Sequence, residues 1–162
     1  MTTQQKVRAE WVNPFLSPAK LVWNAELGCD LELIGAELVS HQFTTEDLTA
    51  VIGVSGKLEG NVLYGFADDC ASAAVGKMLE EPPTAEISQM GLSALGELAN
   101  MITGNAATLL AQNGYTCDIS PPVIIEPAGS RFTTAADQIL VTFNSDIGIL
   151  RIRIYLTENH RA

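Results

Sequence analysis

Four small or polar side chains follow one another at helical spacing in a helix predicted from about residue 85 to residue 112. They are Ser93, Glu97, Asn100 and Gly104, at i, i+4, i+7 and i+11, which places them in one narrow stripe. A carboxylate in such a stripe can pair with a cation, and a carboxamide donates and accepts hydrogen bonds without titrating. The stripe therefore predicts a polar contact surface on which Glu97 and Asn100 lie about one turn apart.

The other side of the same helix is apolar and is expected to face the core. It carries Gly91, Leu95, Leu98, Ile102, Ala106 and Leu109. Two features distinguish the outward stripe from an ordinary solvated helix face. Gly96 and Gly104 each cost the helix about 0.5–1 kcal/mol relative to alanine, and no Lys or Arg occurs between residues 86 and 112. We expect another surface to approach the glycines, either a second helix of this chain or a partner protein.

The elements that position this stripe can be read from apolar periodicity and turn residues. Helices are predicted near residues 11–27, 68–78 and 85–112, and strands near 30–40, 48–55, 61–66, 116–119, 123–126, 139–144 and 149–156. Most strands follow one another through short turns, which is typical of hairpins. The predicted fold class is α/β in a layered α+β arrangement, with one sheet covered by helices.

The two halves of the chain resemble each other. Ser17, Asn24 and Gly28 recur at the spacing of Ser93, Asn100 and Gly104, and the sequence Phe-Thr-Thr at 43–45 returns at 132–134. We interpret the chain as a single domain, 1–162, made of two internal repeats at approximately 9–81 and 84–158. Each repeat would be one helix followed by three strands. The duplication predicts two similar helices on one sheet, related by an approximate twofold axis.

The composition excludes several classes of protein. The chain has 162 residues, 47% hydrophobic and 17% charged, with a net charge of −10; the balance is that of a globular domain, and the negative charge argues against nucleic acid or anionic membrane as a partner. No stretch approaches the ~20 apolar residues of a membrane helix. No apolar run follows the first charged residues at the N-terminus, so a signal peptide is not expected. Three widely spaced cysteines (Cys29, Cys70, Cys117) and two histidines predict no metal site, and we expect buried thiols in the cytoplasm.

The pattern Ser93-x3-Glu97-x2-Asn100 resembles the signature of the CheC/CheX/FliY family of chemotaxis phosphatases, which has Asp or Ser, then Glu, then Asn at this spacing. The opening Asn13-Pro14-Phe15 is also similar to CheX-type members. The resemblance extends over nearly the whole chain in length, element order and duplication, and it implies a CheC-like fold.

The first repeat departs from the family pattern at one position. It keeps Ser17 and Asn24 but has Leu21 where the motif has Glu. One intact motif, in the second half, is similar to CheX members, which are dimers. The resemblance therefore implies a homodimer with one site in each chain.

The resemblance also implies a reaction, the hydrolysis of phospho-aspartate on a CheY-type response regulator that binds its own Mg²⁺. This chain would then bind no cofactor. Asn100 would orient the attacking water, and Glu97 would pair with a lysine in the regulator's active site. Ser93 would add a hydrogen bond to the docking surface, and Gly96 and Gly104 would let the partner's loops approach.

Two other functions compete with a phosphatase. A non-catalytic binding or scaffold module, similar to the middle domain of flagellar switch proteins, would lack the Glu and Asn pair, and the intact Glu97 and Asn100 argue against it. A small-molecule enzyme has little support, because the chain has neither a glycine-rich phosphate loop nor a Cys-His pair.

Overall fold

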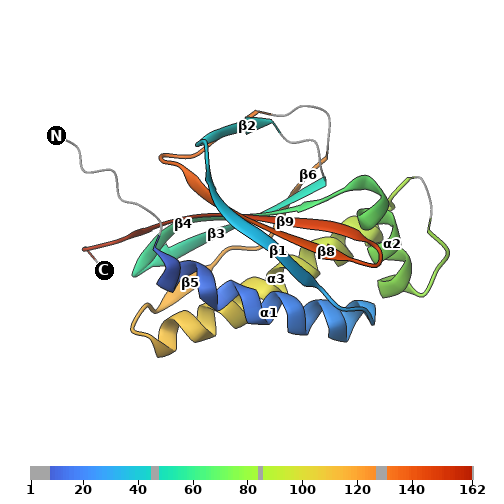
Figure 1. Ribbon diagram of the computed structural model, residues 1–162, viewed down its shortest axis with the longest axis horizontal. Coiled ribbons are helices and arrows are strands. Elements are labelled where there is room, and N and C mark those ends of the chain that lie inside the picture. Colours follow the sequence, from blue (N-terminus) through green and yellow to red (C-terminus); the bar gives the residue numbers. More distant parts are fainter. Residues whose placement is uncertain (1–7, 45–47, 84–85, 127–130, 162) are drawn as a thin grey trace.

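Three helices lie against one antiparallel sheet in the computed structural model, which describes residues 8–44, 48–83, 86–126 and 131–161 (Figure 1). The helices are α1 (Ala9–Leu27), α2 (Asp68–Leu79) and α3 (Gln89–Gln112). The strands are β1 (Glu32–Val39), β2 (Gln42–Thr44), β3 (Leu48–Gly56), β4 (Leu58–Phe66), β5 (Cys117–Ile119), β6 (Val123–Ile125), β7 (Arg131–Thr133), β8 (Gln138–Ser145) and β9 (Gly148–Glu158). The predicted α+β class, a sheet covered by helices, is confirmed.

The main sheet is arranged symmetrically about its centre. Its strand order is β1-β8-β9-β4-β3-β5, and β6 also pairs with β3. The central pair is β4 with β9, where Val62 lies opposite Ile154. The first strands of each half pair with the hairpin of the other half. β1 pairs with β8 of the hairpin β8-β9, and β5 and β6 pair with β3 of the hairpin β3-β4. This is the order that two duplicated units would give, and the duplication itself stays a prediction.

A small second sheet, β2 with β7, was not predicted as strands. Phe43 of β2 lies opposite Phe132 of β7, and their rings stack with centroids 5.6 Å apart. The guanidinium of Arg153 lies 4.1 Å from the centroid of the Phe43 ring. The two Phe-Thr-Thr segments that suggested a repeat therefore pair with each other; Thr45 lies outside the described residues.

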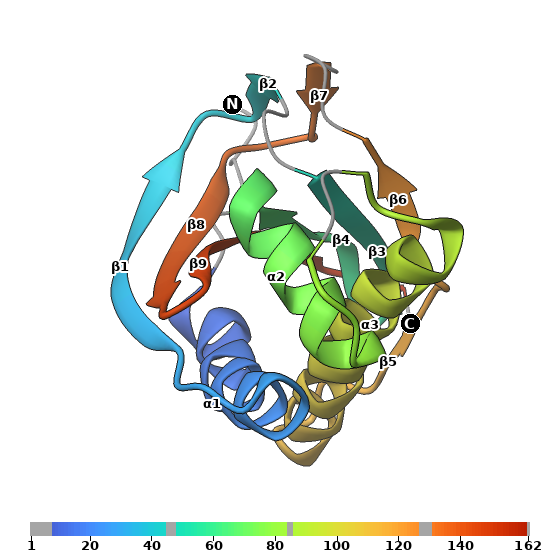
Figure 2. The same ribbon diagram turned by 90° about the vertical axis from the view of Figure 1, so that its right-hand side faces the viewer.

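The core fills the space between the sheet and the helices. The largest side chains in it are the two tryptophans of α1, Trp11 and Trp23, which are 1% and 0% exposed. In Figure 2 the sheet curls around the helices, and α1 and α3 lie side by side. This arrangement turns one apolar side of α3 inward and leaves a polar side outward.

Helix α3 begins later than predicted. The Ser88 side chain accepts a hydrogen bond from the Gly91 backbone N–H at 3.1 Å, and this N-cap sets the start of the helix at Gln89. Of the six residues predicted to face the core, Gly91, Leu95, Leu98, Ile102 and Ala106 are buried. Leu109 is only half-buried, and Leu110 is buried instead.

Candidate functional site

A buried hydrogen bond fixes how α3 is rotated on the sheet. The hydroxyl oxygens of Tyr64, on β4, and Thr103, on α3, lie 2.7 Å apart. Thr103 donates to the carbonyl oxygen of Ala99 at 2.8 Å, so the Tyr64 hydroxyl donates to Thr103. Burial raises the pKa of Tyr64, and the hydrogen bond to Thr103 opposes this effect. The phenol thus stays protonated and holds α3 with its stripe outward.

The structure brings the four residues of the predicted stripe to the outward side of α3. Ser93 and Glu97 are exposed, and Asn100 and Gly104 are half-buried. Among the described residues the side chains of Glu97 and Asn100 make no hydrogen bond or ion pair. A carboxylate and a carboxamide with unused hydrogen-bonding capacity, held on a rigid helix, are available to a second molecule.

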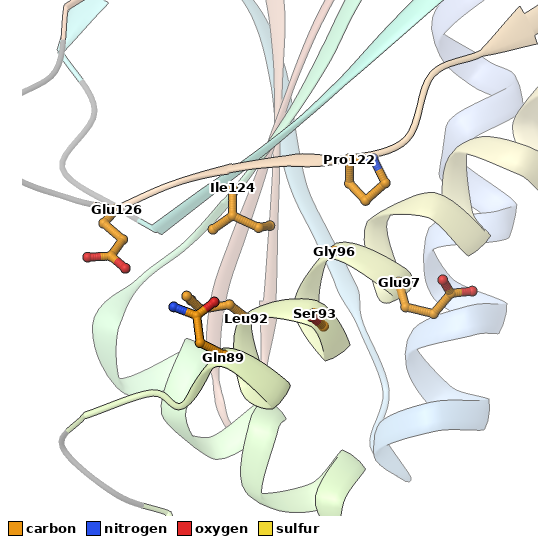
Figure 3. Close-up of a pocket in the computed structure, with 8 residues that line it drawn as sticks. All are labelled: Gln89, Leu92, Ser93, Gly96, Glu97, Pro122, Ile124 and Glu126. Atoms are coloured by element: carbon orange, nitrogen blue, oxygen red, sulfur yellow. The ribbon is translucent and has the colours of Figure 1, made fainter.

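A groove runs along one flank of this stripe, between α3 and the segment that contains β6 (Figure 3). It has a volume of about 410 Å³. It is lined by Gln89, Leu92, Ser93, Gly96 and Glu97 of α3 and by Pro122, Ile124 and Glu126 of the facing segment. Ser93, Gly96 and Glu97 of the predicted site belong to this lining, whereas Asn100 and Gly104 lie outside it.

The surroundings of Gly96 differ from the expectation for that residue. Gly96 is buried, and a β-carbon added there would lie 3.1 Å from Cγ of Pro122 and 3.4 Å from Cδ1 of Ile124. Within the chain, the surface that approaches this glycine is therefore the segment that contains Pro122 and Ile124, and it is not the other repeat helix. A direct contact between Gly96 and a partner remains a prediction. At Gly104 the nearest atom would be Cδ1 of Ile119, at 4.0 Å, so this side of the helix is more open.

The first repeat places its version of the stripe on α1. Ser17, Leu21 and Asn24 are all exposed, and Leu21 is 68% exposed. The Asn24 carboxamide donates a hydrogen bond to the Asp30 carboxylate at 2.8 Å. This copy therefore differs from the α3 stripe in two ways: it lacks the carboxylate, and its carboxamide is already engaged.

No group of three or more His, Cys, Asp or Glu that could hold a metal ion occurs in the described part of the chain. None of the three cysteines forms a disulfide; Cys70 is buried, and Cys29 and Cys117 are half-buried. Burial raises the pKa of the Cys117 thiol.

No described helix is both long and apolar enough to cross a membrane. On α3 itself, Ser93, Glu97 and Asn100 offer a hydroxyl, a carboxylate and a carboxamide.

The matching family model and a curated relative point to the same family. Residues 48–144 match the family model described as chemotaxis phosphatase CheX. The CheY-P phosphatase CheX of Thermotoga maritima is 36% identical over 87 residues, which are 54% of this chain and 56% of that protein. The match thus spans little more than half the length of this relative.

Solved structures share the fold over most of the chain. A CheC-like superfamily protein from a Shewanella species is 25% identical, with a TM-score of 0.81, over 93% of this chain and 99% of that one. A crystal structure described as a CheX-CheY-BeF3-Mg²⁺ complex from Borrelia burgdorferi gives a TM-score of 0.80 at 24% identity, over 93% of this chain and 100% of that one. The predicted CheC-like architecture is confirmed by these likenesses.

Proposed function

Because this chain belongs to the CheX family of chemotaxis phosphatases, we propose that it hydrolyses the phospho-aspartate of a CheY-type response regulator. The observation that carries the proposal is the pair Glu97 and Asn100, which faces outward from α3 without a hydrogen-bond partner among the described residues. The relative from Thermotoga maritima, a CheY-P phosphatase, supports the same activity.

The reaction needs an ordered water more than it needs an acid. The oxygen of water bonds to phosphorus while the bond from phosphorus to the aspartate oxygen breaks. The aspartate leaves as a carboxylate and phosphate is released, with one water proton kept by the phosphate and the other passed to solvent. A carboxylate with an ordinary pKa of about 3.9 leaves at neutral pH without being protonated. Such a step is limited by positioning and by the charge of the phosphoryl group.

Asn100 is the residue that would position the water. Its carboxamide accepts a hydrogen bond from the water and donates to a phosphoryl oxygen without adding a negative charge. It lies in the middle of α3 with glycines at i−4 and i+4, so neither of these positions crowds it, and its neighbour in the stripe is Glu97 at i−3. A position in the middle of a helix orients such a side chain more precisely than a position in a loop does.

Glu97 would dock the regulator rather than take part in the chemistry. A carboxylate near a phosphoryl group is repelled, whereas a lysine of the regulator would attract it. Ser93 would add a hydrogen bond one turn earlier, and Gly104 would leave room for a loop of the regulator. We expect Glu97→Gln to raise KM more than it lowers kcat and to reduce the salt dependence of binding, with Glu26→Gln, an equal charge change on α1, as the control.

Mg²⁺ would belong to the substrate in this account. The described residues contain no cluster of three or more His, Cys, Asp or Glu that could hold a metal ion. The complex from Borrelia burgdorferi, which has the same fold, contains CheY, BeF3 and Mg²⁺. Removing Mg²⁺ with a chelator should therefore stop the reaction without lowering the stability of this chain. A chelator that shifts its unfolding transition would contradict this assignment.

We also propose that the protein is a homodimer in the cytoplasm. Strand β1 is the surface through which we expect the two chains to associate. β1 is an edge strand of the main sheet, and it exposes Leu33, Ile34 and Leu38 by 38%, 61% and 57%. A long apolar edge strand invites pairing with another strand. Light scattering after gel filtration should give the mass of a dimer for the wild-type chain and of a monomer for Ile34→Lys. A wild-type monomer at high concentration would exclude the dimer.

A decay assay separates a phosphatase from a scaffold. A phosphorylated CheY-type regulator with Mg²⁺ loses its phosphoryl group at its own rate, and the chain should accelerate this loss in proportion to its concentration. If the chain binds the regulator but leaves the rate unchanged, the non-catalytic binding module is the correct function.

A further inference from the structure

The groove beside the stripe has an acidic residue that the proposed reaction does not use. We propose that this groove receives one long basic side chain, Arg or Lys, of the response regulator and that Glu126 pairs with its charged end. The inference rests on the proposed function, because it assigns a second contact to the regulator that docks on α3. It makes Glu126 a specificity residue rather than a catalytic one.

The shape and lining of the groove suit the stem of such a side chain. The α3 side of the groove extends from Gln89 to Glu97, eight residues further along the helix, which is roughly 12 Å. Figure 3 shows the side chains of Pro122 and Ile124 directed toward α3, with Leu92 facing them from the helix. Three apolar side chains thus form the middle of the groove, and they can cover the methylene groups of Arg or Lys.

The charges at the ends of the groove select a cation. Glu97 and Glu126 lie at opposite ends, one on each wall (Figure 3), and no lining residue is basic. Neither carboxylate forms an ion pair among the described residues. A basic side chain can pair with a carboxylate of the groove, whereas a purely apolar side chain would leave both carboxylates without a partner. The net charge of −10 adds to the attraction for a basic partner.

The wall that carries Glu126 is held in place before any partner arrives. The backbone N–H of Ser120 donates to the Gly53 carbonyl at 2.9 Å, and the Gly53 N–H donates to the Ser120 hydroxyl at 2.8 Å. β6 then pairs with β3, with Ile124 opposite Ala50. A groove with one wall fixed to the sheet and the other on α3 needs little ordering on binding.

The test compares two charge removals in the full-length chain. Glu126→Gln removes the carboxylate of the groove, and Glu26→Gln removes an exposed carboxylate of α1. The probe is a CheY-type regulator loaded with BeF3 and Mg²⁺, titrated calorimetrically at low and high salt. We expect Glu126→Gln to weaken binding about threefold to tenfold and to reduce its salt dependence, with KM affected more than kcat. Glu26→Gln should bind as the wild type does.

The outcomes distinguish this inference from the proposed function. If Glu126→Gln binds like Glu26→Gln while both dephosphorylate the regulator, the groove does not hold a basic side chain and the phosphatase account stands. If the wild-type chain neither binds nor dephosphorylates the regulator, the proposed function fails and this inference fails with it. Charge reversal by Glu126→Lys should weaken binding further than Glu126→Gln, and equal binding by both variants would also overturn the inference.

Discussion

One added methyl group on α3 should make the protein more stable and less active. A β-carbon at Gly104 would find only Cδ1 of Ile119, at 4.0 Å, which is an ordinary contact. Alanine in a helix interior is favoured over glycine by up to about 1 kcal/mol. Gly104→Ala should therefore raise the free energy of unfolding by about 0.5–1 kcal/mol and the melting temperature by roughly 1–4 °C. The same methyl group enters the docking stripe, one turn from Asn100.

The effect on activity follows from the close approach that docking requires. A misplacement of about 1 Å at a reacting centre can reduce a rate on the order of a hundredfold, so we expect Gly104→Ala to slow dephosphorylation at least tenfold. Urea unfolding followed by circular dichroism gives the stability, and decay of the phosphorylated regulator gives the activity.

Gly96→Ala is the matched control, because its β-carbon would lie 3.1 Å from Cγ of Pro122 and the facing segment must yield. The stability gained there should be smaller or negative. If Gly104→Ala lowers the unfolding free energy, the reasoning about space on this side of α3 is wrong. If it raises stability and leaves the rate of dephosphorylation at the wild-type value, Gly104 does not belong to the docking surface.

Two further predictions concern the buried anchor of α3 and the stripe of the first repeat. Tyr64→Phe should lower the unfolding free energy by about 1 kcal/mol, since Thr103 loses its partner on β4. Because burial raises the pKa of Tyr64 above its ordinary 10.0, wild-type stability should fall as the pH rises above about 10. Tyr64→Phe should fall less steeply in urea titrations; equal slopes would contradict this. Leu21→Glu, at an exposed position, should change stability by less than about 0.5 kcal/mol. It should leave the rate of dephosphorylation per chain unchanged, because Asn24 is bound to Asp30; a faster rate would show that the first stripe becomes active once its carboxylate is present.

Local periodicity predicted much of what positions the stripe. The helical spacing of apolar residues placed Leu95, Leu98 and Ile102 in the core and Ser93 and Glu97 outside, and the structure agrees. Side chains on one helix share a face because of the backbone alone, so no knowledge of distant contacts is needed. The hairpins were predictable for a similar reason, since alternation and turn residues are local features.

The groove could not be predicted, because it depends on contacts between segments that lie far apart in the sequence. Pro122 lies between the predicted strands 116–119 and 123–126, and its contact with Gly96 depends on how β6 joins β3. The glycine at position 96 indicated that another surface approaches the helix, but it did not indicate which part of the chain provides that surface. In the same way, Phe43 and Phe132 indicated a repeat, while their pairing in β2 and β7 depends on long-range register.

The central claim is that Asn100 on α3 orients the water that attacks a phospho-aspartate. The most direct test is the single-turnover decay of a phosphorylated CheY-type regulator with saturating amounts of the wild-type chain or of Asn100→Ala. The account predicts that Asn100→Ala binds the regulator with nearly wild-type affinity and loses at least a hundredfold of the acceleration. If Asn100→Ala accelerates the decay as well as the wild type does, Asn100 does not orient the water and the proposed mechanism is wrong.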